Sequence, residues 1–276
     1  RSVVRLMIDI LDPQEGETVC DPCCGSGGFL IKAFEYVRSK IEREIKESKE
    51  QIKLKYYTDK YYDASKKEQE KIDQKVNDHF TLLNSELDIL NPESRIRRLS
   101  YNCIFGTDAN PRMARTAKMN MIMHGDGHGG VHHHDGLLNV NGIFEDRFDI
   151  ILTNPPFGAR VEKSLKITER DKYTDTERIA KYKKRYGAEY IKALKQINDN
   201  IGKPVLSLFE TGKMSSLTEV LFMERCLDLL KPGGRMGIVL PEGVLNTSKL
   251  QKVRDYVEGT AKIINITSIP QDVFIA

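Results

Sequence analysis

A strand that is stopped by two prolines is the feature that most constrains this chain. Residues 150–152 read Ile-Ile-Leu, and after Thr153 the chain continues Asn154-Pro155-Pro156-Phe157. Proline has a fixed φ and no amide hydrogen, so a buried strand must end abruptly there. The carboxyl end of a buried strand is where open α/β sheets bind ligands. We call residues 154–157 the proline turn.

The proline turn offers two hydrogen-bond acceptors and a ring side by side, namely the Asn154 amide oxygen, the Pro155 carbonyl and the Phe157 side chain. Such a set suits a planar group that carries an amino substituent, and a nucleobase fits that description. The four residues alone would also fit a strand that ends at prolines and binds nothing.

A second turn rich in glycine follows the first expected strand, Thr18-Val19-Cys20. It reads Asp21-Pro22-Cys23-Cys24-Gly25-Ser26-Gly27-Gly28-Phe29-Leu30, and a helical pattern runs on from Ile31 through Val37. Strand, glycine-rich turn and helix form the first half of a Rossmann-like unit. The turn lacks the dinucleotide pattern Gly-x-Gly-x-x-Gly, and its carboxylate would repel pyrophosphate but attract the ammonium of an amino acid. A tight turn without a ligand is the alternative. We call residues 21–28 the glycine loop.

Two further acids are expected at strand ends. A strand over residues 102–107 ends at Asp108, which could bind ribose hydroxyls or simply cap the helix that begins near Pro111 and runs to Met123. Residues 135–138, Asp-Gly-Leu-Leu, are expected to end a short third strand, and the Asp135 carboxylate could meet the edge of a purine.

The remaining pattern alternates helices and strands. We expect a helix over residues 2–11, another from Thr218 to Leu230 that ends at residues 231–234, a strand over 235–241, a helix including 253–257 and a last strand over 262–269. Repeated strand and helix units in 276 residues predict one α/β fold with a doubly wound, mostly parallel sheet.

Two charged segments are expected to be helical insertions in this core. Residues 38–100 interleave Glu and Lys at helical spacing, which is typical of a solvated face rather than of a DNA-contacting arm. The second segment, residues 159–214, is basic: positions 160–203 carry 13 Lys or Arg against 7 Asp or Glu, with tyrosines at 173, 182, 186 and 190. Cations neutralise phosphates and aromatic rings stack on bases, so this segment could face DNA. An amphipathic surface helix is the alternative.

Composition excludes some classes of protein. Five cysteines, an odd number with no secreted spacing, favour free thiols and a reducing compartment, and no apolar run is long enough to cross a bilayer, so a cytoplasmic protein is expected. The chain opens without Met and inside an apolar pattern, which indicates a piece of a longer protein. No metal is expected, because the histidines and the Cys20 and Cys23 pair do not have the complete ligand spacing of a known metal site. The histidines are at positions 124, 128, 132, 133 and 134.

Taken together, the glycine loop, continued as Phe29-Leu30, and the proline turn resemble the S-adenosylmethionine-dependent adenine-specific DNA methyltransferases. Within them the chain is most similar to the modification subunit of type I restriction-modification systems. Other segments share that likeness: residues 6–13, residues 118–121 with His124-Gly125, and residues 230–234 before Leu240-Pro241. The resemblance implies a Rossmann-like methyltransferase fold and a chain that is a fragment of the catalytic domain.

The resemblance also implies roles for individual residues. S-adenosyl-L-methionine would lie on Asp21, Pro22, Cys24, Gly25, Ser26, Gly27, Gly28, Phe29, Asp108, Asp135 and Asn154. The glycine loop would hold its methionine part, Asp108 its ribose and Asp135 its adenine amino group. Asn154, Pro155, Pro156 and Phe157 would be catalytic, with the first two accepting from the target amino group and Phe157 stacking on the target base. The implied partners are double-stranded DNA and a specificity subunit, with a restriction subunit as a further candidate.

These expectations predict methyl transfer to the 6-amino group of an adenine that has left the duplex. The rival enzyme classes are RNA and protein-glutamine methyltransferases, which more often resemble Asn-Pro-Pro-Tyr, so Phe157 favours DNA. A non-catalytic DNA-binding or assembly subunit on the same fold is the rival from another class. Such a subunit should have lost its acceptors or its glycine loop, and this sequence keeps both.

Overall fold

The chain folds around one parallel five-stranded sheet, seen in a computed structural model that describes residues 2–126 and 130–270. The strands are ordered β3-β2-β1-β4-β5, and every neighbouring pair is parallel. Their bounds are β1 Val19–Asp21, β2 Ile104–Asp108, β3 Val131–His133, β4 Phe148–Thr153 and β5 Leu230–Ile238. The predicted doubly wound α/β fold is confirmed.

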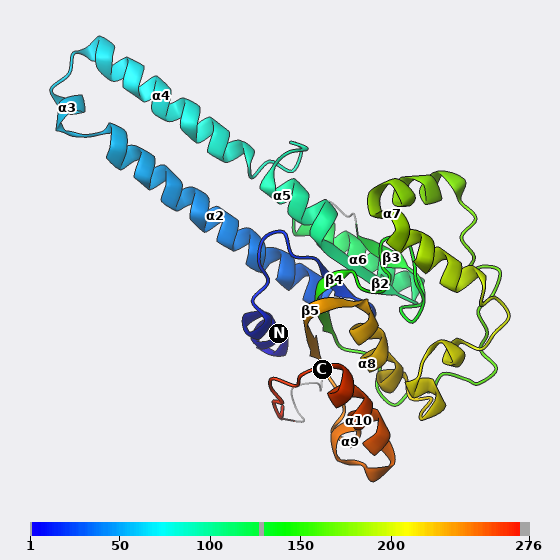
Figure 1. Cartoon of the computed structure of the whole chain (residues 1–276). Coiled ribbons are helices and arrows are strands. Elements are labelled where there is room, and N and C mark those ends of the chain that lie inside the picture. The colour runs from blue at the N-terminus through cyan, green and yellow to red at the C-terminus, as the bar shows by residue number, and fades with distance from the viewer. Residues whose placement is uncertain (1, 127–129, 271–276) are drawn as a thin grey trace.

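Helices make up most of the remaining regular structure (Figure 1). The α-helices are α1 Ser2–Leu11, α2 Gly28–Tyr56, α3 Asp59–Tyr62, α4 Lys66–Ser85, α5 Arg95–Arg98, α6 Pro111–Met123, α7 Thr176–Asn198, α8 Thr218–Leu229, α9 Glu242–Asn246 and α10 Gln251–Thr260. A π-helix, η1, covers Leu99–Cys103, and three short 3-10 helices cover Val205–Leu208 (η2), Thr211–Lys213 (η3) and Ser248–Leu250 (η4). In this described part of the chain, no helix combines the length and apolar character needed to cross a bilayer.

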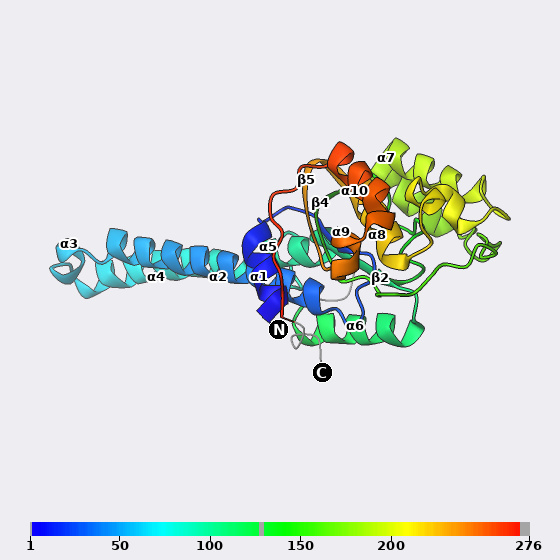
Figure 2. The same cartoon turned by 90° about the horizontal axis from the view of Figure 1, so that it is seen from below.

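Helices cover both faces of the sheet, and successive strand residues point to opposite faces. Val19 and Ile150 lie in the core under α1, α2 and α6, whereas Cys20 and Ile151 lie in the core under α8. Figure 2 shows α6 on one side of the sheet and α7, α8 and α10 on the other. The continuous apolar run in β4 is therefore the pattern of a strand that is covered twice.

A helical hairpin extends far from the sheet. α2 begins in the core, continues past its last buried residue, Ile45, and ends at Tyr56, and α4 returns beside it (Figures 1 and 2). Only Val76 is buried along α4. The outer part of this hairpin keeps most of its side chains in water, as long helices with one narrow apolar contact can. Further along the segment, Ser94, Ile96, Leu99 and Ser100 are buried.

Helix α7 presents its tyrosines inward, in place of the base stacking expected from the sequence. Tyr190 is fully buried, and the rings of Tyr182 and Tyr186 stack at 5.9 Å between centroids. The buried Arg147 guanidinium lies over the Tyr186 ring at 4.6 Å and donates a hydrogen bond of 2.9 Å to its hydroxyl. Tyr182 and Tyr186 are spaced four apart and share one face of the helix before the kink at Gly187, and with Tyr190 after the kink they form the apolar stripe that attaches α7 to the body.

Several strand bounds differ from the predictions. Residues 102 and 103 belong to η1, so β2 begins only at Ile104, and β3 ends at His133 rather than at residues 135–138. β5 already begins at Leu230, which pairs with Phe148, while Arg235 pairs with Ile150. The four residues between them, 231–234, form a bulge. They include Pro232, which has no amide hydrogen to donate, and Gly233, which has φ 81°.

The predicted strand over residues 262–269 is wrong, because this segment has no strand structure. Ile264 and Ile266 are exposed, at 79% and 65% of their surface. Strand formation requires a neighbouring strand that satisfies the backbone amides and carbonyls, and β-branched residues alone do not supply one.

The hairpin allows a direct test of where the core ends. Ile41 is 1% exposed and lies in the main core, whereas Leu54, thirteen positions further along α2, is 69% exposed. Ile41→Ala should lower the free energy of unfolding by about 2–5 kcal/mol because it opens a cavity. Leu54→Ala should change it by less than about 0.5 kcal/mol. Urea unfolding of the two variants measures both values, and similar losses would show that the outer hairpin is packed as tightly as its base.

Candidate active site

The predicted site residues meet at one edge of the sheet, where the carboxyl ends of the strands lie. β1 ends at Asp21, β2 at Asp108 and β4 at Thr153, and Asp135 lies two residues after β3. The chain runs from β1 outward to β3 and then returns to β4, on the other side of β1. This edge is therefore the topological switch point, where doubly wound sheets bind ligands.

The glycine loop is held open by its backbone conformation. Gly25 and Gly27 have φ of 54° and 87°, values that side chains with a Cβ rarely adopt, and Gly27 caps the start of α2. A Cβ on Gly27 would lie 3.3 Å from the Cβ of Ala117 on α6, so glycine is also needed for helix packing. The amide of Cys24 donates to the Thr107 carbonyl at 2.8 Å, which fastens the loop to β2.

Not every residue assigned to the cofactor has a side chain at the surface of the loop. Ser26 and Gly28 are exposed, but the side chains of Cys24 and Phe29 are 5% and 8% exposed and lie in the main core. The Pro22 carbonyl accepts a 2.7 Å hydrogen bond from the Thr107 hydroxyl. These three residues can shape the loop and offer backbone groups, while their side chains face the protein.

Asp21 joins the glycine loop to the proline turn. Its Oδ1 accepts hydrogen bonds from the Thr153 hydroxyl at 2.6 Å and from the Cys23 amide at 3.1 Å. The side chain is 1% exposed, and this burial raises the pKa of Asp21 to about 7, although both hydrogen bonds act in the opposite direction. Thr153, which precedes Asn154, is thus hydrogen-bonded to Asp21, the first residue of the glycine loop.

Asp108 is also bound to the glycine loop. Its Oδ2 accepts from the Gly25 amide at 2.9 Å and its Oδ1 from the Asn110 amide at 2.8 Å. The side chain is half-buried, at the carboxyl end of β2. The Asp108 carboxylate therefore stabilises the turn that leads into α6 and also lies beside the glycine loop.

Asp135 lies in a turn that packs against the glycine loop. Its Oδ1 accepts from the Leu137 amide at 3.0 Å. The next residue, Gly136, lies so close to the loop that a Cβ there would be 1.8 Å from the Pro22 carbonyl oxygen. Glycine is required at this position because any side chain would push the turn away from the loop.

The proline turn itself is open to solvent except at Pro155. Asn154 and Pro156 are exposed, and Phe157 keeps 43% of its surface accessible. The turn ends at Gly158, with φ 69°, whose amide lies 3.4 Å from Oε1 of Glu219 on α8. The fold thus presents the Asn154 amide and the Phe157 ring outward at the sheet edge.

Helix α8 holds three loops of the site through buried charged side chains, which the sequence analysis missed. Glu219, Glu224 and Arg225 are 3%, 5% and 2% exposed. Glu219 accepts from the amide of Gly158, after the proline turn, and Glu224 accepts from two amides and a hydroxyl at residues 210 and 211. The sequence does show charged residues within an apolar helix. Such residues need hydrogen-bond or ionic partners if they are buried.

Arg225 fixes the turn that carries Asp135. Its Nε donates to the Gly136 carbonyl at 3.0 Å and its Nη2 to the Leu138 carbonyl at 3.1 Å, while Nη1 lies 3.3 Å from Glu145. A planar guanidinium can reach two carbonyls and a carboxylate at once, which a lysine ammonium cannot do with the same geometry.

Three thiols near this edge and the imidazole of His132 are uncharged. Burial raises the pKa of Cys20, Cys23 and Cys24, so these side chains stay as thiols. Burial lowers the pKa of His132 to about 4, and it stays neutral. His128 lies outside the described residues. Among residues 2–126 and 130–270, no group of three or more His, Cys, Asp or Glu is arranged to hold a metal ion.

The raised pKa of Asp21 predicts how stability depends on pH. The unfolded chain releases this proton near pH ~4 and the folded protein only near pH 7, so the free energy of unfolding should fall as pH rises through that window. Asp21→Asn keeps the Oδ1 acceptor and removes this contribution. The difference in melting temperature between pH ~5 and pH ~8 should therefore be smaller in the variant.

The comparison isolates Asp21 although the pKa of Asp228 is also raised to about 7 by burial. Asp228 is present in both proteins, so its contribution cancels when the variant is subtracted from the wild type. An identical pH dependence in the two proteins would contradict a raised pKa at Asp21.

The role of Arg225 can be tested with a conservative variant. Arg225→Lys should loosen the turn at residues 135–138, so amide hydrogen exchange measured by mass spectrometry should become faster there. Arg235→Lys is the matched control, because Arg235 bonds to the Leu11 carbonyl and to Glu17 on another part of the fold. Equal protection of residues 135–138 in the wild type and Arg225→Lys would refute the role assigned to Arg225.

Comparison with known sequences gives this arrangement a family. The chain matches the N-6 DNA Methylase family over residues 1–74 and 81–276. The matched ranges contain the glycine loop, Asp108, Asp135 and the proline turn. They also run through both charged segments, apart from residues 75–80.

Curated relatives are similar at low identity. The methylase subunit of the type I restriction enzyme EcoEI of Escherichia coli is 23% identical over 276 residues, which are 99% of this chain and 38% of the relative. The methylase subunit of the EcoKI enzyme of E. coli K12 is 22% identical over all of this chain and 37% of its own length. The chain thus spans less than two fifths of these relatives.

Among solved structures, the fold resembles that of a modification subunit assigned to a type I restriction enzyme of Vibrio vulnificus YJ016. The TM-score is 0.51 at 22% identity, covering 92% of this chain and 36% of the other. At that identity the likeness concerns the fold, and the family rests on the sequence match along nearly the whole chain. The sheet edge built from Asp21, Asp108 and the proline turn is therefore that of a chain belonging to the N-6 DNA Methylase family.

Proposed function

We propose that this chain is the catalytic region of a type I modification subunit that methylates the 6-amino group of adenine in DNA. The observation that carries the proposal is the bond between Thr153 and Asp21, which places the exposed proline turn beside the glycine loop. The family and the names of the relatives support DNA as the substrate over RNA or a protein glutamine.

The glycine loop and the strand-end acids fit S-adenosylmethionine. Asp21 holds the loop in place from beneath, and the space at Gly25 allows the methionine part to approach the backbone closely. Asp108 and Asp135 offer carboxylates at two neighbouring strand ends, which suit ribose hydroxyls and an adenine amino group. When bound, this compound supplies a methyl group on a positively charged sulfur.

The proline turn supplies what the amino group of adenine lacks. The lone pair of that nitrogen is delocalised into the ring, which makes it a poor nucleophile. Acceptance of its two hydrogens by the Asn154 amide oxygen and the Pro155 carbonyl favours a tetrahedral nitrogen and stabilises the positive charge that develops on it. The half-exposed Phe157 ring can stack on the target base and offset part of the cost of unstacking it.

The relatives also suggest which subunits the proposed enzyme assembles with. We infer that a specificity subunit selects the DNA sequence and that a restriction subunit can join the complex, because the matched proteins are methylase subunits of restriction enzymes. The exposed lysines of α7, such as Lys181, Lys183 and Lys184, offer cations for DNA phosphates.

Labelled methyl transfer from S-adenosylmethionine to adenine-containing DNA tests the proposal, with the full-length protein and its partner subunits. Asn154→Ala should lower the rate of transfer by about 100-fold or more, because it removes one acceptor of the developing charge. Asn77→Ala, on the exposed face of α4, is the matched control and should keep the full rate.

Two results would count against the proposal in different ways. Equal rates for Asn154→Ala and the wild type would refute the assigned mechanism. If the full-length wild type does not bind S-adenosylmethionine in calorimetry, the assignment of this compound as the cofactor is refuted.

A further inference from the structure

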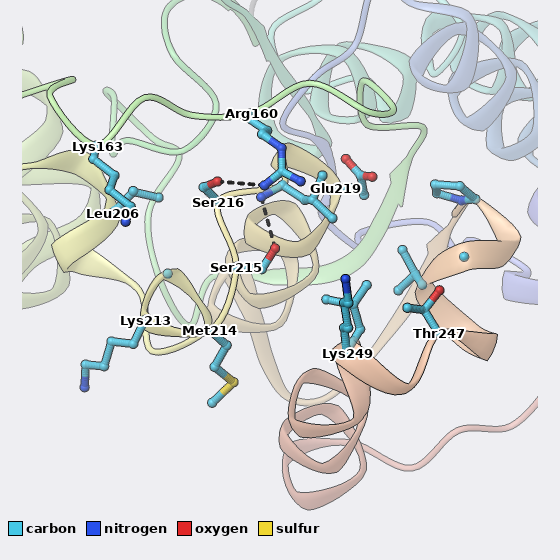
Figure 3. Close-up of a pocket in the computed structure, with 16 residues that line it drawn as sticks. Arg160, Lys163, Leu206, Lys213, Met214, Ser215, Ser216, Glu219, Thr247 and Lys249 are labelled. Carbon is cyan, nitrogen blue, oxygen red and sulfur yellow. Dashed lines mark hydrogen bonds between the residues drawn. The ribbon is translucent and has the colours of Figure 1, made fainter.

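A cavity of about 580 Å³ lies beside the proline turn, and Glu219 of the site described above is part of its wall. It is lined by the segment that follows the turn, by residues 212–217, by the start of α8 and by the segment from Pro241 to Leu250 (Figure 3). Neither the glycine loop nor residues 154–157 line it. A ligand in this cavity would therefore sit next to the target base and not in its place.

The charges around the cavity have opposite signs at different positions. Arg160, Lys163, Lys213 and Lys249 line it, and in Figure 3 Arg160 and Lys249 point toward the same space. Glu219 also lines this space, from the start of α8. Free phosphate would meet the Glu219 carboxylate, and a simple cation would meet four positive side chains, so neither matches the whole lining.

Glu219 leaves one acceptor unsatisfied. The side chain is 3% exposed, its Oε1 accepts from the Gly158 amide, and its buried Oε2 has no hydrogen-bond partner among the described residues. An unpaired oxygen of a buried carboxylate is costly, and a ligand N–H group would relieve that cost.

Among the described residues, the rest of the lining is a mixture of apolar side chains with Ser215, Ser216 and Thr247, and it includes no aromatic ring. Leu206, Met214, Leu217, Val244 and Leu250 offer surfaces on which a flat ring can lie. A volume of this size is in the range of sites for small ligands. The lining thus combines apolar walls, an acceptor for an N–H group and cations for an anion, which together match one nucleotide.

We propose that this cavity takes a second nucleotide of the DNA strand that carries the target adenine. Its base enters between the apolar walls and donates an N–H to Glu219, and its phosphate lies on Arg160 and Lys249. The inference rests on the proposed function. It favours a nucleotide of the strand over a free one because the cavity begins three residues after Phe157, on the same loop that presents the target base.

The experiment uses the full-length protein with its partner subunits and duplexes in which the methylated adenine has been located by the transfer assay. 2-Aminopurine, which brightens when it leaves the base stack, replaces each nucleotide flanking that adenine in turn. In the wild-type complex, one flanking position should brighten several-fold, and it should stay bright because the described residues that line the cavity include no aromatic ring. Methyl transfer is measured in the same complexes.

Two variants and a control assign the signal to the cavity. Glu219→Gln places an N–H₂ group where the unpaired oxygen stands, and Lys249→Ala removes an exposed cation, so both should reduce the flanking signal by more than half. Lys252→Ala, an exposed lysine of α10 outside the cavity, should leave it unchanged. Because Lys249 is at the surface, its variant folds even where Glu219→Gln does not.

The outcomes separate the inference from the function on which it rests. Methyl transfer without a bright flanking position, or a flanking signal that both variants retain, would overturn the second-nucleotide site while leaving the methyltransferase in place. Absence of methyl transfer by the wild type would remove both.

Discussion

The hydrogen bond between Thr153 and Asp21 is the contact on which the candidate site depends. It joins the last residues of β4 and β1, neighbouring strands on the two sides of the switch point. The carboxylate is almost fully buried, which raises its pKa to about 7, and the Thr153 hydroxyl and Cys23 amide offset part of the cost of that burial. The glycine loop and the proline turn consequently keep one relative position.

Helix α8 extends this constraint to the loops around the edge. A charge inside a protein is tolerated when it is hydrogen-bonded, and Glu224 and Arg225 meet that condition by binding backbone groups of separate loops. Loops that would otherwise be free to move are thereby held to one rigid helix. Glu219 meets the condition only in part, and its unpaired oxygen marks the place where a ligand can complete the network.

Local sequence signals predicted the elements that depend on local physics. A run of β-branched residues stopped by prolines, and glycines at the start of a helix, define β4, the proline turn and the glycine loop with little help from the rest of the chain. The failures have a common cause as well. The segment over 262–269 has strand composition without a partner strand, and the tyrosines of α7 have the spacing of a packed face, which their basic neighbours obscured.

The order of residue types is enough to predict which residues stand at strand ends, because proline and glycine restrict the backbone wherever they occur. The alternation of strands and helices is likewise enough to predict the α/β class. Which of those strand ends meet depends on the packing of the whole fold. Thr153 and Asp21 lie 132 positions apart, and Arg225 and Gly136 lie 89 apart. Such contacts follow from strand order and register, which arise when both faces of the whole sheet are buried at once.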